Sequence, residues 1–187
     1  KDEQLMAHAT SDGPIDHLIF IVLQKNNYES VYNQSSAPYL TKIADEYSLL
    51  TNYHALAHAS LPNYLAMIAG SYFNVGRSQP PQSSKHIANY EIITSKMDAK
   101  GVTWKAYMES MPSPCYMTDN GSYVVRHNPF VYFRNVTGDK SYCNDHVVDF
   151  ESLDYDIAND NLPNCVFITL NQNNNGHDSD IAYSDNW

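Results

Sequence analysis

An unbroken run of six apolar residues, Leu18 to Leu23, constrains the fold of this chain more than any other feature. Such a run is typical of a strand that is covered on both faces, as in a parallel sheet. A second apolar run extends from Cys165 to Leu170. Segments with helical spacing lie between the two runs. This alternation predicts an α/β fold, with a mostly parallel sheet and helices on both of its faces.

The chain is expected to form a single domain over residues 1–187. The predicted strands are Ile15–Leu23, Val102–Met108 and Cys165–Leu170, and the predicted helices begin at Pro38 and Ser60 or cover Ile87–Lys100 and Phe150–Asn159. Residues 110–150 show little periodicity and are expected to be irregular. A sheet that ends in a polar tail would leave an apolar edge uncovered. We therefore expect a domain that is incomplete at its C-terminus and is completed by further sequence, by self-assembly or by a second chain.

Composition narrows the classes of function. The chain has 187 residues, of which 43% are hydrophobic and 12% aromatic, so it can bury a sizeable core. Its net charge of -10 argues against nonspecific nucleic-acid binding, which depends on Lys and Arg, but leaves a small phosphate ester open as a partner. No apolar run approaches the roughly 20 residues that span a bilayer.

Ser60 stands at a predicted helix N-terminus. Pro62 suits the first turn of a helix because first-turn N–H groups have no helical partner, and Gly70 is a suitable stop. A hydroxyl at this place meets free backbone N–H groups and the positive end of the helix dipole, which suits a nucleophile that attacks phosphate. Because Ser is also a preferred N-cap, capping is the alternative role for Ser60.

Three polar groups are candidates for a common site: the pair Gln24-Lys25, the turn at Ser60, and the stretch Asn171–Asp178. The first and third follow predicted strands directly, and parallel α/β sheets place their chemistry beyond the carboxyl ends of the strands. We therefore expect the three groups to converge. The alternatives are that Lys25 is a solvated charge and that Asn171–Asp178 is a turn-rich surface loop.

Cysteines and glycosylation sequons bear on the compartment. Cys115 and Cys143 flank a loop-rich stretch, and a disulfide between them would contribute roughly 3 kcal/mol, whereas Cys165 lies in an apolar strand and is expected to be a free thiol. Three sequons begin at Asn33, Asn120 and Asn135. These features favour a disulfide-bonded glycoprotein that is extracellular or at the cell surface.

Six segments, in order along the chain, carry a family resemblance: LIFIVLQKNNY, PYLTKIA, HASLPNYLAMIAGS, WKAYMESMPSPCY, VVRHNPFVYF and LPNCVFITLN. They resemble the bacterial and archaeal phosphoesterase family, which includes secreted acid phosphatases and is related to phospholipases C of the alkaline phosphatase superfamily. The resemblance runs from about Asp16 to Trp187. It implies an alkaline-phosphatase-like fold and the hydrolysis of phosphoric esters.

The resemblance also implies roles for individual residues. Ser60 matches the nucleophile of the family, and Asn63 matches the amide that helps to hold the phosphate. His127 and Asn128 match a motif at the substrate pocket.

Four further residues match positions at or near a divalent metal ion. Gln24 and Lys25 stand where the family has a Glu-Asn pair that binds the metal, and His177-Asp178 matches a His-Asp pair near the site, which adds two candidate ligands. The family carries further acidic metal ligands beyond the position of Trp187. Gln24 lacks the carboxylate charge and Lys25 adds a cation, so both weaken metal binding. The Lys25 ammonium can instead take the place of the metal and contact a phosphate.

Two functions therefore remain. The first is a secreted phosphoric-ester hydrolase of the phosphomonoesterase type, with Ser60 as the nucleophile. The second is a catalytically impaired relative that serves as an extracellular binding or surface-structure protein. The Ser60 and Asn63 pattern favours the first function, and the pair Gln24-Lys25 favours the second.

Overall fold

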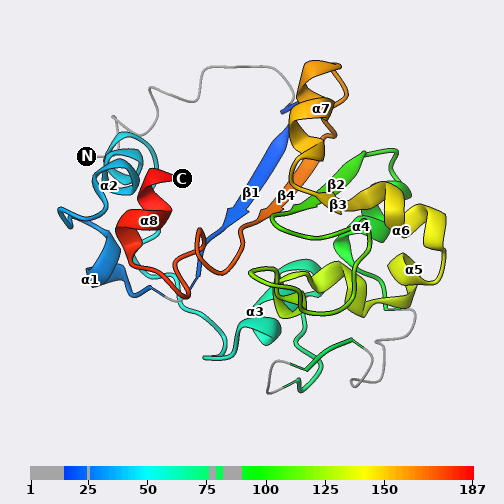
Figure 1. Ribbon diagram of the computed structural model, residues 1–187, viewed down its shortest axis with the longest axis horizontal. Coiled ribbons are helices and arrows are strands. Elements are labelled where there is room, and N and C mark those ends of the chain that lie inside the picture. Colours follow the sequence, from blue (N-terminus) through cyan, green and yellow to red (C-terminus); the bar gives the residue numbers. More distant parts are fainter. Residues whose placement is uncertain (1–14, 25, 76–78, 82–89) are drawn as a thin grey trace.

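A computed structural model describes residues 15–24, 26–75, 79–81 and 90–187. Its centre is one sheet of four parallel strands in the order β1-β4-β2-β3 (Figure 1). The strands are β1 (Leu18–Val22), β2 (Trp104–Met108), β3 (Val147–Asp149) and β4 (Cys165–Thr169). The predicted α/β fold with a parallel sheet is confirmed.

Helices cover both faces of the central strands. α3 (Ser60–Ala69) packs on one face, in the larger core that also holds Trp104 of β2. α7 (Ser152–Ala158) packs on the other face, where Leu153 contacts a smaller core that holds Val166 of β4. Successive residues of a strand point to opposite faces, so each central strand feeds both cores.

The remaining described helices are α1 (Tyr28–Val31), α2 (Pro38–Glu46), α4 (Ile93–Asp98), α5 (Arg134–Thr137), α6 (Lys140–His146) and α8 (Ile181–Asn186). Two short 3-10 helices, η2 (Val125–His127) and η3 (Pro129–Tyr132), lie between β2 and α5. The predicted helices at Pro38 and Ser60 are confirmed, and the one expected over Ile87–Lys100 is shorter in its described part. Residues 87–89 lie outside the described part. None of the described helices is long and apolar enough to cross a membrane.

The prediction that residues 110–150 are irregular is wrong. They hold η2, η3, α5, α6 and β3. These elements are too short to produce a clear period in the sequence, and contacts distant in sequence hold several of them. One such contact is the disulfide between Cys115 and Cys143, whose Cα atoms lie 5.6 Å apart. Cys165 is a buried free thiol, so both cysteine predictions are confirmed.

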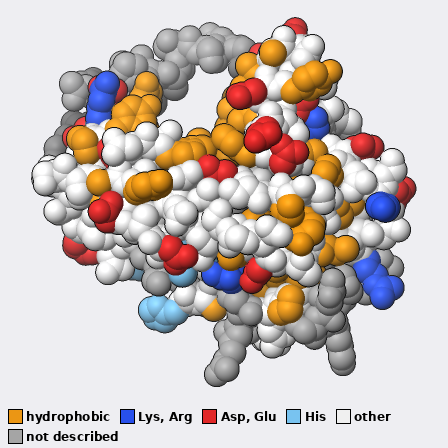
Figure 2. Space-filling view, viewed as in Figure 1, with side chains coloured by type: hydrophobic (Ala, Val, Ile, Leu, Met, Phe, Trp, Pro, Cys, Tyr) orange, Lys and Arg blue, Asp and Glu red, His pale blue; other side chains and the backbone are white. Residues whose placement is uncertain are grey.

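β1 is an edge strand, and the prediction that it is covered on both faces is wrong. Ile19 and Ile21 are 49% and 53% exposed, and within the described residues β1 pairs only with β4. Figure 1 shows α1, α2 and α8 grouped beyond β1, and Figure 2 shows hydrophobic side chains at the surface between this group and α7. An apolar strand sequence shows that the strand can be buried, but the elements packed against the strand determine how much of it is buried.

Candidate active site

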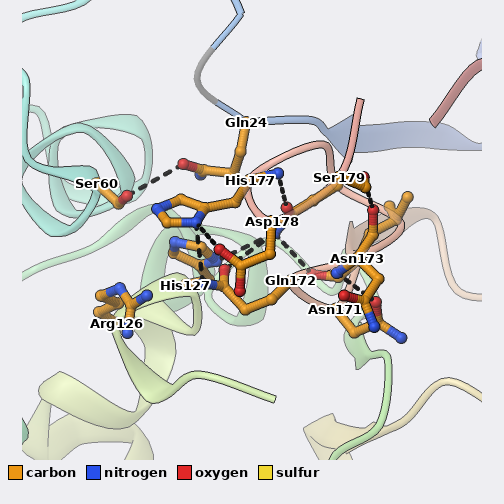
Figure 3. A network of polar contacts seen from close by, with 12 residues as sticks. Gln24, Ser60, Arg126, His127, Asn171, Gln172, Asn173, His177, Asp178 and Ser179 are labelled. Carbon is orange, nitrogen blue, oxygen red and sulfur yellow. Dashed lines mark hydrogen bonds and ion pairs between the residues drawn. The ribbon is translucent and has the colours of Figure 1, made fainter. Parts of the chain in front are cut away.

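Ser60 is the first residue of α3, and its side chain does not cap the helix. The N-cap position belongs to Ala59, which makes no side-chain cap bond, and the helix ends at Gly70 in the left-handed conformation, with a φ of 67°. The Ser60 hydroxyl instead donates a hydrogen bond to Gln24 Oε1 over 3.0 Å (Figure 3). The capping alternative is therefore wrong, and the hydroxyl faces the end of β1.

Gln24 follows β1 and joins three parts of the structure. Its backbone N–H donates to the carbonyl oxygen of Asn175 over 2.8 Å, which ties the loop after β1 to the loop after β4. Its side-chain Nε2 donates to the Tyr64 hydroxyl over 2.8 Å, while Oε1 accepts the bond from Ser60. The Gln24 amide is thus held at both of its ends. Lys25, the other half of the predicted pair, lies outside the described residues.

Asn63 organises the loop that leads into Ser60. Its Oδ1 accepts from the backbone N–H groups of Leu56 and Ala57 over 2.8 and 3.3 Å. Its Nδ2 donates to the carbonyl oxygens of Ala57 and Ala59, both over 2.8 Å. The Asn63 amide therefore fixes the path of the backbone that leads to Ser60. Its predicted contact with phosphate stays a prediction.

His177 and Asp178 lie in the loop that follows β4. Asp178 Oδ1 is 2.6 Å from His177 Nδ1, and because a carboxylate only accepts, this contact places the ring proton on Nδ1. In Figure 3 the other ring nitrogen points toward Ser60. Gly176 has a φ of +83°, and a Cβ there would come within 2.8 Å of Ser184 Oγ. A glycine is therefore required to turn the chain into this pair.

His127 and Asn128 are buried beside the site, with exposed fractions of 1% and 0%. The His127 ring stacks on Tyr64 with a centroid distance of 5.2 Å, and its Nδ1 lies 3.4 Å from Asn175 Nδ2. Burial, and secondarily the charge of Arg126, lowers the pKa of His127 to about 3. His127 is therefore neutral near pH 7. Among the described residues, His127 Nε2 and Asn128 Oδ1 have no hydrogen-bond partner. Their predicted contact with substrate stays a prediction.

The candidate metal ligands Gln24, His177 and Asp178 are engaged with other side chains. Gln24 Oε1 already accepts from Ser60, and His177 and Asp178 contact each other. Within the described part of the chain, no three His, Cys, Asp or Glu side chains converge as a metal site would require. The described residues alone do not make a complete divalent-metal site. The metal stays a prediction.

The sequons differ in accessibility. Asn33 and Asn120 are exposed. The Asn135 side chain is half-buried, and its Nδ2 donates to Tyr90 O and Ser95 Oγ over 2.9 and 2.8 Å. A glycan on Asn135 would replace one of the two Nδ2 hydrogens and would therefore remove at least one of these bonds. Glycosylation itself stays a prediction.

Sequence reasoning missed Tyr64, Asn175 and Arg126. Tyr64 is four residues after Ser60, and residues at this spacing lie on the same helix face, which was an available signal. Asn175 belongs to a run of asparagines, and the sequence does not show which of their side chains is buried. Arg126 brings a positive charge next to His127 and forms a long ion pair, 3.9 Å, with Asp119.

Comparisons with known proteins identify the family of the chain. The model of the Phosphoesterase family matches residues 6–187. A probable acid phosphatase from Kluyveromyces lactis is 33% identical in an alignment of 175 residues that covers 89% of this chain and 40% of that protein. A phosphate-repressible acid phosphatase from Penicillium chrysogenum is 32% identical over 92% of this chain and 42% of its own length.

A bacterial relative also matches. A phosphatidylinositol-3-phosphatase from Mycobacterium tuberculosis is 27% identical over 91% of this chain and 54% of its own length. The chain thus spans about two fifths of the length of the two fungal acid phosphatases and about half of the mycobacterial enzyme. Because fungal as well as bacterial proteins match, the comparisons support the family as a whole and do not single out a bacterial and archaeal branch. The chain belongs to the Phosphoesterase family.

Proposed function

We propose that this chain carries the nucleophile of a phosphoric-ester hydrolase and that Ser60 is that nucleophile. The observation that carries the proposal is the meeting of three segments at one place: Gln24 after β1, Ser60 at the start of α3, and the His177-Asp178 pair after β4. This is the carboxyl edge of a parallel sheet, where such folds bind their ligands.

The arrangement supports attack on phosphorus. Ser60 Oγ forms a bond to phosphorus while the bond from phosphorus to the ester oxygen breaks. Gln24 Oε1 orients the hydroxyl but is too weak a base to take its proton. In this mechanism His177, with its proton held on Nδ1 by Asp178, takes the Ser60 proton on its other ring nitrogen and returns it to the leaving oxygen. Water then hydrolyses the phosphoserine.

Two features favour a phosphate at this place. The first N–H groups of a helix have no helical partner, and α3 begins at Ser60, so its amides and dipole favour an anion. Arg126 adds a positive charge on η2, the turn that also carries the buried His127. The substrate class is a small phosphate ester, in line with the names of the acid phosphatases that the chain resembles.

If a divalent metal ion binds at this site, Gln24, His177 and Asp178 would be among its ligands. When bound, it would stabilise the charge on the phosphoryl oxygens. The extracellular location is supported by the disulfide and by the exposed sequons at Asn33 and Asn120. A second chain or a second copy that completes the sheet at β1 is supported by the open strand edge.

The test is hydrolysis of an aryl phosphate with and without chelator. Four proteins are compared: the unmodified chain, Ser60→Ala, the double variant Gln24→Glu with Lys25→Asn, and Ser141→Ala, an exposed serine on α6, as the matched control. Turnover that Ser60→Ala abolishes and Ser141→Ala retains would support the hydrolase. The double variant should bind metal more tightly, because it gains a carboxylate and loses a cation.

The second function, a catalytically impaired phosphate-binding protein, is favoured by one observation. Gln24 is neutral, and its amide is already held by Ser60 and Tyr64. This function predicts phosphate binding without turnover in the unmodified chain. Equal turnover by the unmodified chain and Ser60→Ala would rule out Ser60 as the nucleophile.

A further inference from the structure

We infer, on the basis of the proposed function in which Ser60 is the nucleophile, that Tyr64 is a positioning residue of the site. Its hydroxyl holds the Gln24 amide in the orientation that fixes the Ser60 hydroxyl, and its ring supports His127. Tyr64 therefore links the nucleophile to the buried histidine through one side chain.

The hydrogen bonds define a chain of three side chains. Gln24 Nε2 donates to the Tyr64 hydroxyl over 2.8 Å, and Gln24 Oε1 accepts from Ser60 over 3.0 Å. The bond from Gln24 Nε2 to Tyr64 by itself restrains the amide, because rotation of Oε1 away from Ser60 would also break the bond at Nε2. The Tyr64 hydroxyl therefore decides where the acceptor for Ser60 lies, although it is not itself within the bond to Ser60.

The burial of Tyr64 makes it a firm support. Its side chain is 2% exposed, and burial raises its pKa well above the usual value, so the hydroxyl stays protonated and neutral. On its other side the ring stacks on His127 with an interplanar angle of 21°. A buried aromatic ring loses little conformational freedom when it makes these contacts, so it transmits position rather than charge.

The role follows from helix geometry. Ser60 and Tyr64 are one turn apart on α3, so both project from the same face, toward the end of β1. Gln24 reaches across from β1 and bonds to both. The helix thus fixes the distance between Ser60 and Tyr64, the residue that holds Gln24. This distance does not depend on the conformation of a loop.

The first experiment measures the rate at which a fluorophosphonate labels Ser60, read by mass spectrometry on the 187-residue chain. Tyr64→Phe keeps the ring and should slow labelling about three- to tenfold, the fold-change for one neutral hydrogen bond. Gln24→Leu should slow it as much, and the double variant should be no slower than the slower single variant, because Tyr64 acts through Gln24. The control is Tyr132→Phe, which removes a buried hydroxyl bonded to Gln79 O over 2.6 Å, outside this chain of side chains.

A wild-type labelling rate in Tyr64→Phe, or losses that multiply in the double variant, would overturn the inference. Thermal unfolding of each variant checks that the fold persists. The second experiment follows the Gln24 side-chain amide by NMR and needs no reactivity. Its resonances should change in Tyr64→Phe and in Ser60→Ala but not in Tyr132→Phe.

The two experiments separate the failure of the inference from the failure of the proposed function. If Ser60 is never labelled, the proposed nucleophile is wrong, and the NMR measurement still decides whether Tyr64 holds Gln24. An unchanged Gln24 amide in Tyr64→Phe would refute the positioning role whatever the chemistry of Ser60.

Discussion

Asp185 on α8 caps the N-terminus of α2 through Leu40. Its Oδ1 accepts from the Leu40 N–H over 2.7 Å, and its Oδ2 accepts from the Tyr39 N–H over 3.1 Å. The residue before the helix, Ala37, has no side chain that can cap, and Pro38 has no N–H to satisfy. A carboxylate that is distant in sequence therefore does what a local Ser or Asp usually does.

Replacing Asp185 with Ala should lower the free energy of unfolding by about 1 kcal/mol and the thermal midpoint by about 2–4 °C. It leaves two first-turn N–H groups of α2 without a protein acceptor. Faster hydrogen exchange at Tyr39 and Leu40 would locate the effect. The control is Asp154→Ala, an exposed carboxylate in the first turn of α7. An equal loss in both variants would show that charge rather than capping matters.

A buried ion pair stabilises the face of the sheet opposite α3. Asp156 Oδ2 accepts from Lys105 Nζ and from the Tyr107 hydroxyl, both over 2.6 Å, and its side chain is 4% exposed. Burial alone would raise the pKa of Asp156, but the bonds from Lys105 and Tyr107 outweigh burial and lower it. The charged form is therefore the one that the fold holds.

Asp156→Asn should cost about 2 kcal/mol at pH 7, because it leaves the Lys105 ammonium without its counter-ion. Since the folded pKa is depressed, this stability is present above the ordinary carboxyl pKa and is lost as the pH falls through the folded pKa. Urea unfolding at pH 7 and pH 3 should thus show a difference that shrinks in acid. A difference of the same size at both pH values would contradict the assignment.

The neutral, buried His127 should make the fold sensitive to acid. Its folded pKa, about 3, lies below the ordinary value of 6.5, so the unfolded chain binds the proton first between these two values. Stability should therefore be complete above about pH 6.5 and should fall by up to about 1.4 kcal/mol per pH unit below it.

His127→Phe keeps a ring against Tyr64 and removes the titration. The slope of unfolding free energy against pH, measured between pH 6 and pH 4, should decrease in this variant relative to wild type. The matched control is His54→Gln, which removes an exposed histidine from a loop and should retain the wild-type slope. Identical slopes in wild type and His127→Phe would mean that His127 does not resist protonation.

The apolar edge strand should promote self-association. Ile21 is 53% exposed on β1, so Ile21→Lys should change the free energy of unfolding by less than about 1 kcal/mol while reducing association, as edge lysines do in natural sheets. Sedimentation at several protein concentrations measures the effect. Tyr155→Lys on α7, 69% exposed, makes a similar change away from the edge. Association that responds equally to both variants would exclude β1 as its origin.

The sequence predicted those features of the fold that depend on residues close together in the chain. Pro62 and Gly70 mark the start and end of α3 because the turn geometry at each end involves only neighbouring residues. The strands at Val102–Met108 and Cys165–Leu170 were visible because central strands are mostly apolar. The convergence of Gln24 and Ser60 followed from the edge rule for parallel sheets.

The features that the sequence did not predict depend on contacts between residues far apart in the chain. The exposure of β1, the cap from Asp185 and the engagement of Gln24 by Tyr64 depend on residues distant in sequence. A pattern of residue types carries no information on such partners. The burial of His127 could not be predicted either, because the sequence of a polar motif does not show whether its histidine faces solvent or the core.

The bond from the Gln24 N–H to Asn175 O has a consequence for biosynthesis. The loop that orients Ser60 is anchored to a residue far along the chain, so a growing polypeptide emerges with β1 and α3 long before β4 and its loop are made. During that interval β1 has no partner strand, and the Ser60 hydroxyl has no fixed neighbour. Pairings of such long range form slowly and expose the chain to aggregation. The geometry around Ser60 therefore cannot form until β4 and the loop that follows it have been made, and chaperone dependence should centre on Leu18–Val22.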